Sequence, residues 1–330
     1  MAAEIAEIPA VAERLLGAGD IERLAERLRG RTFPFVVICG RGSSGHAGVY
    51  LRYLIETRLG LVVSAAAPSV ITNYERTQAM QGALFIVISQ SGRSPDLIAA
   101  TEAAVKAGAL TVAMVNDTAS PVANAAALVL PLLAGPEHSV AATKTVAASM
   151  IAAAQLAALL ADDRDLLAAA ARWPARLQAA LALDWSAWGA ALGHGRAAFV
   201  AGRGYGFGPV RELALKLGET MRLPALGYSA AELRHGPRAA IAADTPVLLL
   251  RQADETAAAI DLLAADLRGA APLFVAGGPA GNLPWLTDDY PACDPVTMLL
   301  PAYLVIEGAT RAAGFDPDKP PHLSKVTETL

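Results

Sequence analysis

The feature of this sequence that most constrains its fold is an internal repeat, with an offset of 162 residues that carries position 40 onto position 202. FVVICGRG at 35–42 aligns with AAFVAGRG at 197–204. Agreement of several short apolar runs at one offset is hard to obtain by chance, so a duplicated domain is the simplest explanation. Three further runs align without a gap: LFIVISQ (84–90) with the run that ends at Gln252, LTVAMVN (110–116) with PLFVAGG (272–278), and LVLP (128–131) with YPAC (290–293).

Each copy alternates apolar runs of four to six residues with longer helical patterns. Such alternation is typical of parallel strands joined by crossover helices. The predicted fold class is therefore α/β, with two tandem doubly wound, flavodoxin-like domains and parallel sheets. The 54% of hydrophobic and 18% of charged residues favour a compact fold.

Between the copies, residues 162–192 contain Pro174 and an apolar residue every three or four positions, which predicts a helical connection with the boundary near 165–190. After Gly314 the chain contains three prolines and lacks a core of its own, so this tail must dock or be mobile. The predicted regions are an N-terminal helical segment (1–30), a first domain (31–170), a second domain (171–312) and a tail (313–330).

Charge and cysteine content narrow the class of protein. The net charge of −4 leaves no basic surplus to neutralise a nucleic-acid backbone. Two cysteines are too few for a disulfide framework or a cysteine zinc site, which favours the reducing cytoplasm. The N-terminus has no secretory pattern, and Val146 to Ala161 is too short and too mildly apolar to span a bilayer, so it is predicted as a buried helix. We expect no nucleic-acid or membrane partner.

Serine-rich loops follow two of the predicted strands of the first copy. In SQSGRSPD (89–96), Ser94 suits a helix N-cap and Pro95 the first helical position. Backbone N–H groups, hydroxyls and a positive helix end would gather there, which predicts an anion pocket; an ordinary capping turn is the alternative. The loop at 40–46 has the pattern G-x-G-x-x-G, but no acidic residue ends a second strand, so a dinucleotide site is weakly indicated.

These two loops predict one phosphate site, with Ser44, Ser89, Ser91 and Ser94 as hydroxyl donors. The second copy has two carboxylates, Asp254 and Glu255, at the corresponding place. Because carboxylates repel phosphate, only the first copy is expected to bind it.

The second copy carries a different set of polar residues. Lys216 and Glu219 share a helix face and can converge on a small ligand, or form a surface salt bridge. His235, before Gly236 and Pro237, is either a proton-transfer group or a capped surface histidine, and the other histidines offer no metal-ligand spacing. Lys325 in the tail can close over a ligand and attack a carbonyl, or simply be solvated.

Five motifs occur together in this chain: SQSGRSPD (89–96), GPEHSVAATKT (135–145), GRGYGFGPVRELALKLGETM (202–221), AELRHGP (231–237) and LSKVTETL (323–330). In this order and spacing they resemble the sugar isomerase (SIS) superfamily. The resemblance is to the isomerase half of glucosamine-6-phosphate synthase and to stand-alone glucosamine-6-phosphate deaminases, and it runs from about Phe35 to Leu330.

The resemblance implies a role for individual residues. Glu219 matches the base that moves a proton between C1 and C2, and Lys216 matches its lysine neighbour. His235 matches the ring-opening histidine, which in the family belongs to the partner subunit of a homodimer with a shared active site, and Lys325 matches the tail lysine that reaches the sugar carbonyl. The phosphate-binding positions match Ser44, Ser89, Gln90, Ser91 and Ser94.

Two departures from the family leave the sugar open: Ala142 stands where the synthase has a serine near the sugar hydroxyls, and Arg93 replaces an acid in the phosphate loop. The synthase also has a glutaminase domain, for which we expect no counterpart here, so the chain would use or release free ammonia.

The expected reaction is therefore conversion of glucosamine 6-phosphate to fructose 6-phosphate and ammonia, or the reverse, with no cofactor or metal. The alternatives are a deglycase for phosphorylated ketosamine–amino acid adducts and a sugar-phosphate sensor without catalysis.

Overall fold

The computed structural model describes residues 1–325, which divide into two compact units. Of the described residues, the first-repeat unit contains Val11–Glu137, Lys144–Leu167, Ser324 and Lys325. The second-repeat unit contains Met1–Ala10, His138–Thr143 and Ala168–Leu323. Each unit therefore includes a short segment that is distant in sequence from the rest of it.

The first-repeat unit is built on a five-stranded parallel sheet with the order β2-β1-β3-β4-β5. This is the order expected of a flavodoxin-like, doubly wound sheet. The three central strands are buried, as parallel strands covered on both faces must be, whereas the two edge strands are partly exposed. The strands are β1 (Val36–Cys39), β2 (Val63–Ala65), β3 (Leu84–Ser89), β4 (Leu110–Val115) and β5 (Leu128–Pro131).

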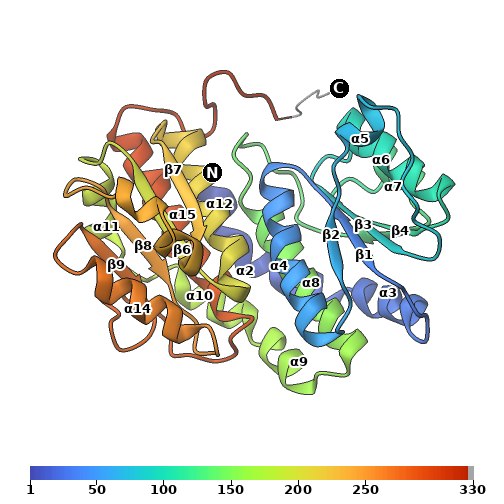
Figure 1. The fold of residues 1–330 in the computed structure, drawn as a ribbon, viewed down its shortest axis with the longest axis horizontal. Coiled ribbons are helices and arrows are strands. Elements are labelled where there is room, and N and C mark those ends of the chain that lie inside the picture. The colour runs from blue at the N-terminus through green and yellow to red at the C-terminus, as the bar shows by residue number, and fades with distance from the viewer. Residues whose placement is uncertain (326–330) are drawn as a thin grey trace. The chain divides into compact units, whose positions relative to one another are not determined.

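Helices cover both faces of this sheet because successive strand residues point to opposite sides. Val37, Phe85 and Val87 share one core with Leu97 and Val122 of the helices α6 and α7. On the other face lies α4, which packs on α8, and α8 in turn packs on α3 (Figure 1). The helices associated with this sheet are α2 (Ile8–Gly17), α3 (Asp20–Leu28), α4 (Gly42–Arg58), α5 (Ser69–Thr72), α6 (Pro95–Lys106), α7 (Pro121–Ala125) and α8 (Lys144–Ala161).

Helix α8 confirms the prediction of a buried helix at 146–161. Of the helices within residues 1–325, it is the one that is long and apolar enough to cross a membrane, with a mean hydropathy of 1.5. However, 83% of it is buried inside the structure. Burial of this kind is typical of the central helix of a packed domain.

The second-repeat unit repeats the same topology with one strand fewer. Its parallel sheet has the order β7-β6-β8-β9, and Phe199, Leu249 and Val275 share a core with the helices α13 and α14. Helix α12 packs on α15, which also contacts α10 and α11. The strands are β6 (Ala198–Gly202), β7 (Ala225–Ser229), β8 (Val247–Leu250) and β9 (Leu273–Ala276). The helices are α1 (Ala2–Ala6), α10 (Trp173–Ala180), α11 (Ser186–Leu192), α12 (Phe207–Met221), α13 (Ala230–Arg234), α14 (Ala257–Leu267) and α15 (Asp294–Ala312).

The repeat predicted three strand pairs correctly and one incorrectly. β1, β3 and β4 correspond to β6, β8 and β9, as the common offset implies. The alignment of LVLP with YPAC (290–293) is wrong as a structural match, because 290–293 is a turn that leads into α15. Cys293 N donates to Tyr290 O at 2.7 Å, and Pro291 has no N–H for a strand ladder. The predicted helical connection between the copies is confirmed by α9 (Arg164–Ala171), α10 and α11.

Candidate active site

The serine loops of the first-repeat unit lie at the switch point of its sheet. β1 and β3 are direct neighbours, with Val36 paired to Leu84 and Cys39 to Val87, and the chain leaves them toward β2 on one side and β4 on the other. Ligands of open α/β sheets bind at such a point, outside the carboxyl ends of the strands. The loop at 40–46 and the loop at 90–94 share this edge, as the sequence predicted.

Both loops end in the first turn of a helix. Ser44 lies in the first turn of α4, and Ser94 is the N-cap residue of α6 although its side chain makes no capping hydrogen bond. A side chain at Gly40 would come within 3.0 Å of the backbone of Ser44, so glycine permits the tight passage from β1 into α4. Helix N-termini present unpaired backbone N–H groups, so this edge can hold an anion.

The loop after β3 is fixed by its own hydroxyl groups. Ser89 Oγ accepts a hydrogen bond from Gly92 N at 3.0 Å, and Ser91 Oγ accepts one from Arg93 N at 3.3 Å. Gly92 has a φ of +61°, and a Cβ there would lie 2.1 Å from Ser120 Oγ. Gly92 is therefore required for this loop conformation, both by its backbone and by its surroundings.

Two arginines border these loops, and each is paired with an aspartate. Arg41 Nε donates to Asp96 Oδ2 at 2.8 Å, and Asp96 is buried. Arg93, the residue that departs from the family, donates to Asp117 Oδ2 at 2.9 Å on the surface. The hydrogen bond from Arg93 lowers the pKa of the Asp117 carboxyl, with further help from the N–H of Ala119. Arg93 and Asp117 thus form a surface ion pair with no net charge beside the serine loop.

The corresponding edge of the second sheet is filled by the protein's own groups. Gln252 is fully buried after β8, and its Nε2 donates to Arg203 O at 2.7 Å and to Thr256 Oγ1 at 2.9 Å. Asp254 accepts hydrogen bonds from the backbone N and the hydroxyl of Thr256 at 2.9 and 2.6 Å. The loop is thus closed on itself and carries an anionic group where the first copy has serines.

Helix α12 carries a stripe of three charged residues. Lys216 Nζ pairs with Glu219 Oε2 and lies 3.5 Å from Glu212 Oε1. The side chains of Glu212 and Lys216 have no exposed surface, whereas 22% of the Glu219 side chain is exposed. Lys216 and Glu219 thus form the salt bridge that the sequence left as an alternative, but it is not a surface pair, because the ammonium is buried between two carboxylates. Glu219 is the member of the stripe that solvent or a ligand can reach.

Sequence reasoning did not single out Glu212. The signal was present, since Glu212, Lys216 and Glu219 follow the four- and three-residue spacing of one helix face. Tyr303 of α15 donates its hydroxyl hydrogen to Glu212 Oε1 at 3.5 Å. Sequence alone could not show that α15 covers this part of the stripe.

His235 lies apart from this stripe. It is exposed directly after α13, which shares a core with α14, whereas Lys216 lies on α12. Its backbone N donates to Ala231 O and Glu232 O at 3.2 and 3.1 Å. Among residues 1–325, no hydrogen bond or ion pair joins His235 to Lys216 or Glu219, and no three His, Cys, Asp or Glu residues are grouped as metal ligands.

Lys325 is docked in the first-repeat unit. Its Nζ donates to Glu137 Oε2 at 2.9 Å, and 24% of its side chain is exposed. The description of a simply solvated tail lysine is therefore wrong. The partner residue, Glu137, belongs to the GPEHSVAATKT motif.

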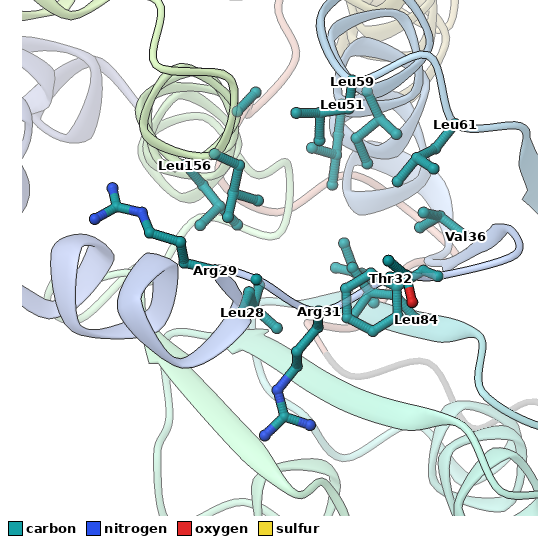
Figure 2. Close-up of a pocket in the computed structure, with 16 residues that line it drawn as sticks. Leu28, Arg29, Arg31, Thr32, Val36, Leu51, Leu59, Leu61, Leu84 and Leu156 are labelled. Atoms are coloured by element: carbon teal, nitrogen blue, oxygen red, sulfur yellow. The ribbon is translucent and has the colours of Figure 1, made fainter.

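A cavity of about 380 Å³ lies at the opposite, amino edge of the first sheet. It begins at Val36 and Leu84, the first residues of β1 and β3, and its walls are mainly apolar, with side chains from α4, from α8 and from the chain at residues 28–33. Figure 2 shows Leu51, Leu59, Leu61 and Leu156 around it, with the guanidinium groups of Arg29 and Arg31 at the margin. Its walls offer few partners for sugar hydroxyls, so the serine loops remain the candidate site.

Taken together, the chain is a doubly wound α/β protein with a repeated fold, and serine-bearing loops lie at the switch point of its first sheet, where proteins of this class bind their ligands. Comparison with known proteins identifies the family. The SIS domain model matches residues 35–159 and 192–284, and the chain belongs to the SIS domain family.

Individual relatives agree with this assignment. A glutamine–fructose-6-phosphate aminotransferase (isomerizing) of Chlorobaculum tepidum is 31% identical over 96% of this chain and 54% of its own length. The chain thus spans about half the length of the curated relatives it matches. A crystal structure of a candidate phosphosugar isomerase from Silicibacter pomeroyi has a TM-score of 0.89 and 39% identity, covering 96% of this chain and 98% of that one. The glucosamine-6-phosphate deaminase of Thermotoga maritima has the same fold, with a TM-score of 0.80 and 21% identity over 99% of both chains.

Proposed function

We propose that this protein is a phosphosugar isomerase of the deaminase type, which converts glucosamine 6-phosphate and water to fructose 6-phosphate and ammonia, or runs the reverse reaction with free ammonia. The observation that carries the proposal is the Lys216–Glu219 pair, in which a reachable carboxylate is held against a buried ammonium. Aldose–ketose isomerisation requires a base of this kind next to a fixed positive charge. The names of the relatives, an isomerizing aminotransferase and a deaminase, support the same reaction class.

The serine loops would bind the phosphate group of the substrate. Neutral hydroxyl and backbone N–H donors at two helix N-termini can hold a phosphate without a lysine. Fixing this end of the sugar phosphate supplies orientation for the reaction at the other end. The residues proposed for this role are Ser44, Ser89, Gln90, Ser91 and Ser94.

Glu219 would act on the open-chain form of the sugar. It removes the proton from C2 to give an enolamine and returns a proton to C1, which leaves an imine at C2. Water then adds to the imine, and ammonia departs. A positive charge from Lys216 or Lys325 would stabilise the negative charge that develops on the C1 oxygen. Positioned proton transfer of this type contributes roughly 10²–10⁴ in rate.

We further propose that the protein works as a homodimer, in which His235 of the partner subunit assists ring opening. The exposed position of His235 on its own chain supports this assignment. Cys39 and Cys293 are both buried free thiols, which supports activity in the reducing cytoplasm.

The test compares three substrates: glucosamine 6-phosphate, galactosamine 6-phosphate and fructosyl-amino acid phosphates. It measures the amine released, which is ammonia from the first two and the amino acid from the third. The sugar phosphates expected are fructose 6-phosphate, tagatose 6-phosphate and glucose 6-phosphate, respectively. Turnover of glucosamine 6-phosphate above the other two supports the proposal. Preference for the fructosyl adducts would identify a deglycase instead. Tight binding of the phosphosugars without any turnover would identify a sensor. Sedimentation that shows a fully active monomer would contradict the proposed dimer.

A further inference from the structure

A buried carboxylate of the first-repeat unit holds the lysine of the C-terminal tail. Glu137 Oε2 accepts a hydrogen bond from Lys325 Nζ at 2.9 Å, and the Glu137 side chain has no exposed surface. The two residues are 188 positions apart in the sequence. This contact therefore places Lys325 against the first-repeat unit.

The Glu137 carboxylate is held independently of the tail. Its Oε1 accepts from Thr145 N at 3.1 Å, and its Oε2 accepts from Thr145 Oγ1 at 2.8 Å. Thr145 lies in the first turn of the 18-residue helix α8, whose positive end favours a carboxylate. The tail lysine thus meets a carboxylate that the rest of the unit has already oriented.

The loop that contains Glu137 is tied to the carboxyl edge of the first sheet. Asn116, the first residue after β4, donates from Nδ2 to Gly135 O at 2.8 Å and accepts from Ala134 N at 2.9 Å. Leu132 N donates to Val115 O, which extends the pairing of β5 with β4 to the same edge. Glu137 therefore follows a loop anchored at the edge where the serine loops end.

We propose that Glu137 is a positioning residue, which docks the ammonium group of Lys325 at this edge, beside the phosphate-binding loops. The proposal rests on the proposed function, because it presents the lysine to a sugar whose phosphate those loops bind. A lysine loses side-chain and backbone freedom when it is ordered. A fixed buried carboxylate offsets this loss before substrate arrives, so Lys325 does not have to be ordered at each turnover.

Trypsin provides a test of docking that does not depend on activity. Cleavage after Lys325 requires its side chain to leave Glu137 and enter the protease, whereas Lys319 is followed by Pro320 and resists cleavage. The native protein is digested, and cleavage after Lys325 is monitored by mass spectrometry. We expect Glu137→Gln to raise the rate of this cleavage by roughly tenfold, because a charge-assisted hydrogen bond is lost. Glu137→Asp keeps the charge but shortens the reach and should also raise the rate.

The matched control is Asp117→Asn, which removes a carboxylate from the same edge that pairs with Arg93 and not with the tail. It should leave the cleavage rate unchanged. If Glu137→Gln and Glu137→Asp are cleaved at the wild-type rate, the docking role is overturned.

Kinetics test the second half of the proposal. Glu137→Gln should lower kcat by roughly tenfold with little change in KM, because the serine loops still bind the phosphate. The double variant Glu137→Gln/Lys325→Met should be no slower than Lys325→Met alone, since both changes remove the same positioned ammonium. Additive losses would contradict this role. If the Glu137 variants are cleaved faster than wild type but the wild-type protein turns over no phosphosugar, the docking stands and the proposed function fails.

Discussion

Replacement of Lys216 by Met should destabilise the second-repeat unit strongly. Lys216 and Glu212 have no exposed side-chain surface, so the variant removes the ammonium that lies beside a carboxylate in the interior. Removal of one partner from a buried ion pair costs about 3–5 kcal/mol. Glu219 contributes less to this loss, because 22% of its side chain is exposed and it can turn to water.

The four tryptophans allow this loss to be measured in the affected unit. All of them lie in the second-repeat unit, so urea unfolding followed by tryptophan fluorescence reports on that unit alone. We expect the free energy of unfolding of Lys216→Met to fall by about 3–5 kcal/mol. The tryptophans are Trp173, Trp185, Trp188 and Trp285.

The matched double variant isolates the cause of this loss. In Lys216→Met/Glu212→Gln the buried charge is gone, and at least half of the lost stability should return. The reasoning is refuted if the free energy of unfolding of Lys216→Met lies within about 1 kcal/mol of the wild-type value, because that is less than the usual cost of an unpaired buried charge. A double variant that is as unstable as Lys216→Met would also refute it.

Three further predictions concern burial and the serine loop. Burial raises the pKa of Asp294 from 3.8 to about 6, so the folded state binds this proton more tightly and stability falls as pH rises from about 4 to 6. Between pH 4 and pH 7, the free energy of unfolding of Asp294→Asn should therefore rise by up to about 3 kcal/mol relative to that of wild type, as measured by urea unfolding at both pH values. A difference between the two proteins that is the same at both pH values would contradict this. Burial also raises the pKa of Cys39 to about 12 and that of Cys293 well above its usual value, so a thiol reagent should label neither in the native protein and both in urea. In Gly92→Ala, the added Cβ would lie 2.1 Å from Ser120 Oγ at a backbone φ of +61°. The substitution should lower the free energy of unfolding by at least 1 kcal/mol and raise KM for the phosphosugar. An unchanged KM would argue against the loop as the phosphate site.

Much of the fold was predictable because short apolar runs recur at one offset. Parallel strands buried on both faces produce such runs, and a common offset fixes which strands correspond. The offset does not hold at 290–293, where YPAC resembles an apolar run but Pro291 and the turn before Asp294 lead into a helix. An aligned run therefore predicts a strand only when its backbone N–H groups can join a ladder.

The candidate site was predictable only in part. Ser89, Ser91 and Ser94 follow one another along the chain, so their proximity was visible in the sequence. Glu137 and Lys325 are far apart in sequence, and the burial of Glu212 depends on packing by α15. Such contacts arise from tertiary structure, and neither spacing nor periodicity in a single sequence can reveal them.

The central claim is that Glu219 is the base of a phosphosugar isomerase. The most direct measurement compares fructose 6-phosphate formation from glucosamine 6-phosphate by the wild type and by Glu219→Gln, with substrate affinity measured by calorimetry. We expect the wild type to turn over and the variant to be roughly 10²–10⁴ slower, with its affinity for glucosamine 6-phosphate largely retained. A variant that keeps most of the wild-type rate would contradict the account.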